Sequence, residues 1–196
     1  DMSMRSHVSK TVSTGFARLR QLRSIRRSVP RSVVQSLVTS LVLSRLDYGN
    51  ATLAGIPQHL LRRLPSVMNA AARLIYLSSR FEPINPLLRQ LHWLKAKERI
   101  DFKLVVLVFK CVHGSAPPYL ADELSRPADS QARCRLRSAS SHTLLVRRTR
   151  LTTVGDRSFP VAASRVWNNL PQHVISSPAL QVFKNLLKTH LFSSFF

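Results

Sequence analysis

Acidic residues are scarce in this 196-residue chain. It carries nine Asp and Glu against thirty Lys and Arg, so its formal net charge at neutral pH is +21. Repulsion among like charges opposes compaction of such a chain unless a polyanion neutralises it. The shortage of acids also argues against two-metal phosphoryl transfer, which needs clustered carboxylates; we expect the one adjacent pair, Asp122 and Glu123, to stabilise a helix N-terminus instead. Nucleic acid is the first expected partner, and an anionic membrane surface is the second.

Cysteines, glycines and long apolar runs are also few. The two cysteines, Cys111 and Cys134, form no CxxC pair, which excludes a disulfide framework and a four-thiolate zinc site. Cys111 is expected to be a core thiol rather than half of a dyad with His113. None of the five glycines precedes a Lys-Ser or Lys-Thr pair, so no phosphate-binding loop is present. The longest apolar stretch, 33–43, is too short and too often interrupted to span a membrane.

The spacing of apolar residues predicts a mainly α fold, with a helical bundle followed by a small helical C-terminal domain. The segment 97–113 is apolar on nearly every side, which is typical of a central helix. Pro65 should kink or split the helix that contains it, because proline removes a backbone donor. We expect residues 78–86 to form a linker at a domain boundary. Helices are expected over 12–27, 31–46 (with Val33, Val34, Leu37 and Leu41 buried), 59–76, 86–91, 97–113 and 158–168, and after Ser177-Pro178.

The first predicted helix carries a stripe of arginines. Arg20, Arg23 and Arg27 share one face, Arg18 and Arg26 lie beside it, and no acid occurs between Asp1 and Asp47. A solvated face is the simpler interpretation of a charge run. The lack of a compensating acid favours contact with nucleic-acid phosphates, which arginine binds in a bidentate manner.

A second basic region, residues 126–150, is rich in serine and arginine. Contact with phosphates through Arg147, Arg148 and Arg150 and a basic loop that is mobile without a ligand are equally open interpretations. The flanking segments 144–146 and 151–154 are candidates for a short hairpin. Aromatic residues are few, and we expect Phe16, Tyr48, Tyr76, Trp93, Tyr119 and Trp167 to pack in cores or corners, which gives base stacking little support.

Several segments taken together carry a resemblance to a known family. They are LRQLRSIRRS (19–28), SRLDYGNATLAGIP (44–57), INPLLRQLHWL (84–94), ERIDFKLVVLVFKCVHGSAPPYL (98–120), LVRRTRLTTVGDRSF (145–159) and AASRVWNNLP (162–171). In these segments and their order, the chain resembles the C-terminal part of reverse transcriptases from LINE-type, jockey-like non-LTR retrotransposons.

The resemblance implies a division of the chain into three parts. Residues 1–10 would be the tail of the polymerase palm, 11–77 a thumb-like helical region, and 78–196 the C-terminal region with a basic loop at 126–150. A thumb holds the template–primer duplex through its backbone, which agrees with the arginine stripe. Gly49, where the family usually has Cys, and Pro65, inside a helix that the family keeps continuous, depart from its pattern.

The family's catalytic aspartates, which hold Mg²⁺ in the palm, have no counterpart here. The resemblance therefore implies an RNA-directed DNA polymerase as the parent protein, with this chain binding RNA, DNA or their hybrid, and the palm, without catalytic residues or a cofactor of its own. The parent would work as an element ribonucleoprotein in the nucleus and cytoplasm.

Two other interpretations stay open: a stand-alone RNA-binding or interaction module derived from an element, and a decayed copy without a function. Binding to a membrane surface ranks below these, because the basic helix lacks bulky interfacial aromatics.

Overall fold

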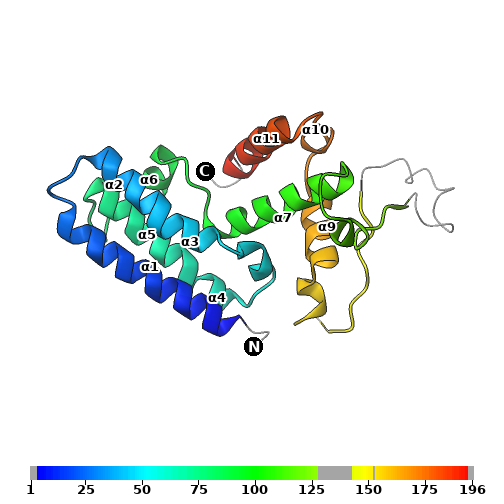
Figure 1. Cartoon of the computed structure of the whole chain (residues 1–196), viewed down its shortest axis with the longest axis horizontal. Coiled ribbons are helices and arrows are strands. Elements are labelled where there is room, and N and C mark those ends of the chain that lie inside the picture. Colours follow the sequence, from blue (N-terminus) through cyan, green and yellow to red (C-terminus); the bar gives the residue numbers. More distant parts are fainter. Residues whose placement is uncertain (1–3, 128–142, 152, 194–196) are drawn as a thin grey trace. The chain divides into compact units, whose positions relative to one another are not determined.

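The computed structural model of this chain describes residues 4–127, 143–151 and 153–193. Over these residues the fold is helical and contains no strand, which confirms the prediction of a mainly α fold (Figure 1). The chain forms two compact units that divide between Arg99 and Ile100. The linker predicted at residues 78–86 lies within the first unit, and the polymerase subdomains implied by the resemblance stay a prediction.

Three helical stretches build the first unit. Helix α1 (Arg5–Ile25) packs against α5 (Arg63–Tyr76), and both contact a rod made of α2 (Arg31–Val38), a π-helix, η1 (Thr39–Leu43), and α3 (Ser44–Asp47). The Arg63 side chain donates to Ser9 near the start of α1, and Arg26 bonds to backbone carbonyls at the end of α5. Helices α1 and α5 therefore run in the same direction, and the rod returns the chain between them.

The buried face of the rod differs from the predicted one. Val34 is buried as expected, but Leu37 is only half-buried, and Val33 and Leu41 are exposed. The prediction failed because α1 and α5 cover only a narrow row of residues four apart, and because a π turn holds more residues than an α turn and so changes the register after Val38. The residues of the rod that are buried are Val34, Val38, Val42, Leu43 and Leu46.

Short elements surround this bundle. The break predicted near Pro65 is confirmed: α4 (Gln58–Leu61) ends before Arg62, and α5 begins at Arg63. Pro65 then lies in the first turn of α5, where the backbone N–H groups have no partner within the helix. A 3₁₀ turn, η2 (Asn50–Leu53), and α6 (Asn85–Gln90) complete the unit, together with the first turn of α7 (Ala96–Val112).

The second unit forms around the rest of α7. The Phe109 ring stacks on Phe183 of α11 (Leu180–Ser193) with 4.2 Å between the centroids, and Trp167 of α9 (Phe159–Asn168) lies 5.9 Å from Phe183. All three side chains are buried. The unit also contains the short helices α8 (Pro118–Ala121) and α10 (Gln172–Ile175) and a 3₁₀ turn, η5 (Gly155–Arg157).

Two expectations for the second unit meet the structure differently. The expectation that Asp122 and Glu123 begin a helix was wrong, because α8 starts at Pro118 and has ended by Ala121. Residues 143–151 are irregular, and neither they nor residues 153 and 154 form a strand, so the described part of the basic region is a loop and not a hairpin. Residues 128–142 of that region lie outside the described residues.

Candidate nucleic-acid interface

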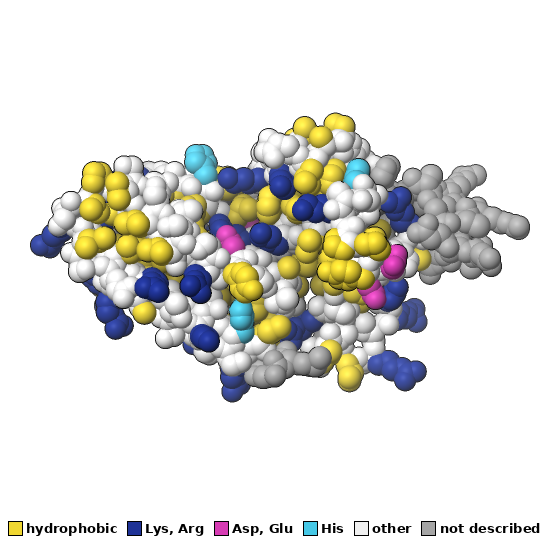
Figure 2. All heavy atoms as spheres, in the orientation of Figure 1, with side chains coloured by type: hydrophobic (Ala, Val, Ile, Leu, Met, Phe, Trp, Pro, Cys, Tyr) yellow, Lys and Arg dark blue, Asp and Glu magenta, His cyan; other side chains and the backbone are white. Residues whose placement is uncertain are grey.

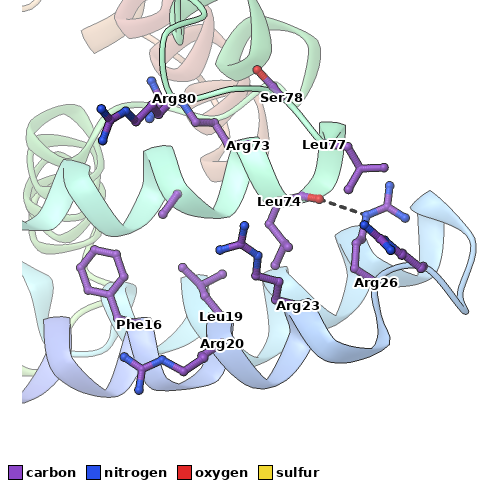
Figure 3. A pocket seen from close by; sticks show the side chains of 12 residues that line it. Phe16, Leu19, Arg20, Arg23, Arg26, Arg73, Leu74, Leu77, Ser78 and Arg80 are labelled. Atoms are coloured by element: carbon purple, nitrogen blue, oxygen red, sulfur yellow. Dashed lines mark hydrogen bonds between the residues drawn. The ribbon is translucent and has the colours of Figure 1, made fainter.

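A groove of about 620 Å³ lies in the first unit, between the C-terminal halves of α1 and α5 (Figure 3). Every charged side chain that lines it is an arginine, and most of the remaining wall is apolar. The lining residues are Arg20, Arg23, Arg26, Arg27, Arg73 and Arg80 together with Phe16, Leu19, Ala70, Leu74, Leu77 and Ser78. Concave sites of this volume bind small molecules or single groups of larger ligands.

The groove exists because α1 and α5 are held together differently along their lengths. At Gly15 the two helices approach so closely that an added Cβ would stand 2.8 Å from Cγ1 of Val67. Near their C-terminal ends the connection is made by the long side chain of Arg26, whose Nε donates to the Leu74 carbonyl at 3.0 Å and whose Nη2 donates to the Ile75 carbonyl at 2.8 Å. The space between these two connections is the groove.

Three of the predicted arginines line the groove with free guanidinium groups. Arg20, Arg23 and Arg27 are exposed and have no hydrogen-bond or ion-pair partner among the described residues. Arg23 extends from α1 toward α5, and the ring of Phe16 also stands between the two helices (Figure 3). Because like charges gather here with no carboxylate in the lining, the groove attracts anions.

The other two predicted arginines of α1 have different surroundings. Arg26 also lines the groove, but its guanidinium is occupied by the carbonyls that end α5, so it acts mainly as a structural clamp. Arg18 does not line the groove, and its Nη1 donates to the side-chain oxygen of Gln21 at 3.0 Å. The helical period places Arg18 well over 90° around α1 from the groove side.

Arg73 and Arg80 were not predicted, although both line the groove. Arg73 lies on a helical stripe of α5 with Ala70, Leu74 and Leu77, and this spacing is the signal in the sequence that pointed to one shared face. Its Nη2 donates to the Glu82 carbonyl at 3.4 Å, while its Nε is buried without a hydrogen-bond partner. The guanidinium carbon of Arg80 lies 4.7 Å from the centre of the Phe81 ring.

One carboxylate, that of Glu82, lies close to the lining residues Ser78 and Arg73. Glu82 accepts hydrogen bonds from the Ser78 hydroxyl at 2.5 Å and from the backbone N–H of Ser79 at 3.2 Å. The hydroxyl, then the N–H, and more weakly the positive charge of Arg73 lower the pKa of Glu82 from its usual value. Glu82 thus stays ionised mainly through serine donors.

The predicted arginines of the second unit are exposed but do not line the groove. Arg147 forms an ion pair with Glu123 at 3.3 Å, and both side chains are about half exposed. Arg148 and Arg150 are also exposed. Outward-facing pairs of this kind contribute little to stability, since water competes for both charges.

The loop that carries these arginines is anchored at two points. The side-chain amide of Asn168 accepts from the Leu144 N–H and donates to the Leu144 carbonyl, both at 2.9 Å. Asp156 accepts from the Thr149 hydroxyl at 2.5 Å and from Arg165 at 3.0 Å. The bonds from Arg165 and then Thr149 lower the pKa of Asp156, so this carboxylate remains charged in its role as an anchor.

The groups considered for other chemistry are not arranged for catalysis. Burial raises the pKa of the Cys111 thiol, and the His113 ring stacks on Phe109 with its Nδ1 2.9 Å from the Phe109 carbonyl. Cys111 is a core thiol, as predicted. Glu98 is only 3% exposed and its Oε2 has no hydrogen-bond partner, so the ion pair expected for it is not present at that oxygen. Among the described residues, no group of three or more His, Cys, Asp or Glu could hold a metal ion.

The aromatic residues divide into two groups. Trp93 and Trp167 are buried as expected. Phe16, Tyr48 and Tyr119 are exposed, so the expectation that they pack in cores or corners was wrong. The groove lining therefore contains an aromatic ring, on Phe16, that is 37% exposed.

Three comparisons were made with known proteins. No protein-family model, no curated protein and no solved structure matches this chain. None of the helices in the described part is long and apolar enough to cross a membrane. Lys and Arg side chains spread over the face of the molecule shown in Figure 2, with Asp and Glu in few places, as expected from a net charge of +21.

Proposed function

We propose that this chain contributes nucleic-acid binding to a LINE-type reverse transcriptase, as its thumb-like and C-terminal region without the catalytic palm. The groove between α1 and α5 is the observation that carries the proposal. It brings six arginines of three separate segments together with no carboxylate in the lining. A solvated charge run gives no reason for arginines from α1, α5 and the loop after α5 to gather at one concave site.

Phosphate groups fit the free guanidinium groups of the groove. Along α1, successive Cα atoms of Arg20, Arg23 and Arg27 rise by about 4.5 and 6 Å, because an α-helix rises 1.5 Å per residue. A row of guanidinium groups at such intervals can donate to phosphates that follow one another along a strand. Contacts of this type position a nucleic acid without reading its sequence.

The polymerase reaction itself is assigned to the parent protein. Its Mg²⁺ ions would be held by carboxylates of the palm, and we propose no catalytic or metal-binding residue in this chain. The purified chain is expected to incorporate no deoxynucleotide on a primed RNA template. Incorporation above a heat-inactivated control would contradict the proposal. The parent would act within an element ribonucleoprotein in the cytoplasm and nucleus.

The decisive experiment is a salt series. Binding of the chain to a fluorescent RNA–DNA hybrid is measured by anisotropy, and the logarithm of the association constant is plotted against the logarithm of the salt concentration. Each phosphate contact adds about 0.9 to the magnitude of the slope. The triple variant Arg20→Ala, Arg23→Ala, Arg27→Ala is therefore expected to bind weakly, with a slope about 2.7 smaller in magnitude if three contacts are lost.

A matched control separates the groove from total charge. Arg18→Ala, Arg45→Ala and Arg62→Ala combined remove the same charge from exposed residues of the same unit that do not line the groove. We expect this control to keep most of the affinity and slope. No binding of the native chain at moderate salt, or equal losses in both triple variants, would overturn the proposal.

A further inference from the structure

The groove has an apolar surface that phosphates alone would not cover. Phe16, Leu19, Leu74 and Leu77 line it beside the arginines. Phe16 is 37% exposed and Leu77 is 66% exposed, so two large apolar side chains of this lining face solvent. A ligand that matches the groove must present negative charge and a flat or apolar group at the same place.

We propose that the groove binds a single-stranded stretch of RNA or DNA, with one base against the ring of Phe16 and neighbouring phosphates at Arg20 and Arg23. This inference rests on the proposed function and adds the form of nucleic acid that the groove takes. In a duplex the bases are paired and turned inward, so a duplex offers phosphates to the rim and nothing to the apolar wall. Single-strand binding by other proteins combines a basic groove with aromatic rings in this way.

The positions of the side chains support a base at Phe16. Phe16 and Arg20 are four residues apart on α1 and therefore neighbours on its surface, and Arg23 follows one turn later. On the α5 side, Ala70 also lines the groove and contributes only a methyl group. The volume of about 620 Å³ suits a group of nucleotide size.

An acidic amphipathic helix is the competing occupant. Such a helix needs a row of apolar contacts repeated every three or four residues along a groove. Of the apolar residues that line this groove, only Phe16 and Leu77 are exposed large hydrophobics, and they belong to different helices. The observations therefore favour a nucleotide.

The test compares two labelled 12-nucleotide strands of equal charge, one unstructured and complete, the other abasic, for binding to the full chain at one salt concentration. We expect the native chain to bind the complete strand at least about 5-fold more tightly, the lower end of what one stacked base contributes. Phe16→Leu, which keeps an apolar side chain but removes the ring, should abolish this preference. Equal binding of the two strands by the native chain would overturn the inference, whatever the folding of any variant.

Phe81→Leu is the matched control. Phe81 is 82% exposed, lies in the same unit and does not line the groove, so the same substitution there should keep the preference. Loss of the preference in Phe81→Leu with retention in Phe16→Leu would place the base elsewhere and overturn the inference. So would tighter binding of a Glu- and Leu-rich helical peptide than of the complete strand. Failure of the proposed function is a different result, in which neither strand nor the hybrid binds.

Discussion

Two arginine-rich regions of this chain look alike in the sequence and differ in the structure. Both Arg20–Arg27 and Arg147–Arg150 contain closely spaced arginines and no acid. In the first unit, Arg20, Arg23 and Arg27 line a groove and have no partner among the described residues. In the second, Arg147 pairs with Glu123, and the neighbouring Thr149 is bonded to Asp156.

The difference lies in which acids the fold brings near each region. In the second unit, acids distant in sequence from the loop reach its side chains and hold them. In the first unit, the nearby Glu82 is held by Ser78 and Ser79, so the free arginines keep their donors. A run of arginines therefore indicates an anion site only when the fold leaves the guanidinium groups unpaired beside a concave surface.

The largest expected effect compares the two regions directly. Arg20→Ala, Arg23→Ala and Arg27→Ala together should weaken hybrid binding at least about 100-fold, because each hydrogen bond to a charged group contributes about 1.5–3 kcal/mol. Arg147→Ala, Arg148→Ala and Arg150→Ala remove the same charge but should weaken it less than about 10-fold, because they take away long-range attraction that salt screens. Anisotropy titrations at physiological salt measure both. Equal losses would remove the distinction drawn between the regions.

The second prediction separates structure from binding within α1. Arg26→Met keeps the length of the side chain but loses the bonds to the Leu74 and Ile75 carbonyls, so it should lower the free energy of unfolding by about 1–3 kcal/mol. Arg23→Met should change it by no more than about 0.5 kcal/mol, as is usual for exposed sites, and should weaken hybrid binding instead. Urea unfolding and hydrogen exchange of residues 63–76 measure stability. A stable Arg26→Met variant would contradict the clamp.

The third prediction concerns strain in the groove wall. Leu77 ends α5 in the left-handed region with φ 56°, which costs a residue with a Cβ about 1 kcal/mol. Leu77→Gly should relieve this strain and raise the free energy of unfolding by about that amount, because the exposed side chain buries little surface. Leu77→Ala removes the same side chain but keeps the Cβ, and should give no such gain in urea unfolding. Similar stabilities for the two variants would show that the gain has another source.

The smallest expected effect is a shift in one pKa. Ser78→Ala removes the main donor to Glu82 and should raise the pKa of that carboxyl toward its usual value, whereas the pKa of Asp156, lowered mainly by Arg165, should not move. Because the folded pKa of Glu82 is lowered, the stabilisation is present above the pKa of the unfolded chain and is lost as the pH falls through the folded value. The stability difference between native chain and variant should therefore shrink on acidification.

Carbon-detected NMR titration of the carboxyl groups follows both residues. Ser79→Ala is the matched control, because the Glu82 bond comes from the backbone N–H of Ser79 and survives the substitution. A larger shift in Ser79→Ala than in Ser78→Ala would contradict the assignment of the main donor.

The long helices could be predicted from the sequence because their apolar spacing is a local property. The side of the rod that is buried could not, since Val33 and Leu41 are as apolar as Val34 and Val42, and only the placement of α1 and α5 selects between them. For the candidate site, the spacing of Arg20, Arg23 and Arg27 was sufficient. Arg73 and Arg80 belong to the groove through packing between helices, and Arg26 leaves the free set because its side chain meets the end of α5.

The π-helix between α2 and α3 sets the rotational phase of everything that follows it in the rod. Asp47, at the end of α3, forms an ion pair with Arg99, whose Nε donates to its Oδ1 at 2.8 Å, and so attaches the first turn of α7 to the first unit. Deleting one residue from Thr39–Leu43 would turn the residues after it by about 100° around the axis, because each residue of an α-helix accounts for that angle. Leu46 would leave the core and Asp47 would face away from Arg99. At this place the number of residues, more than their identity, stores the information that joins the helices.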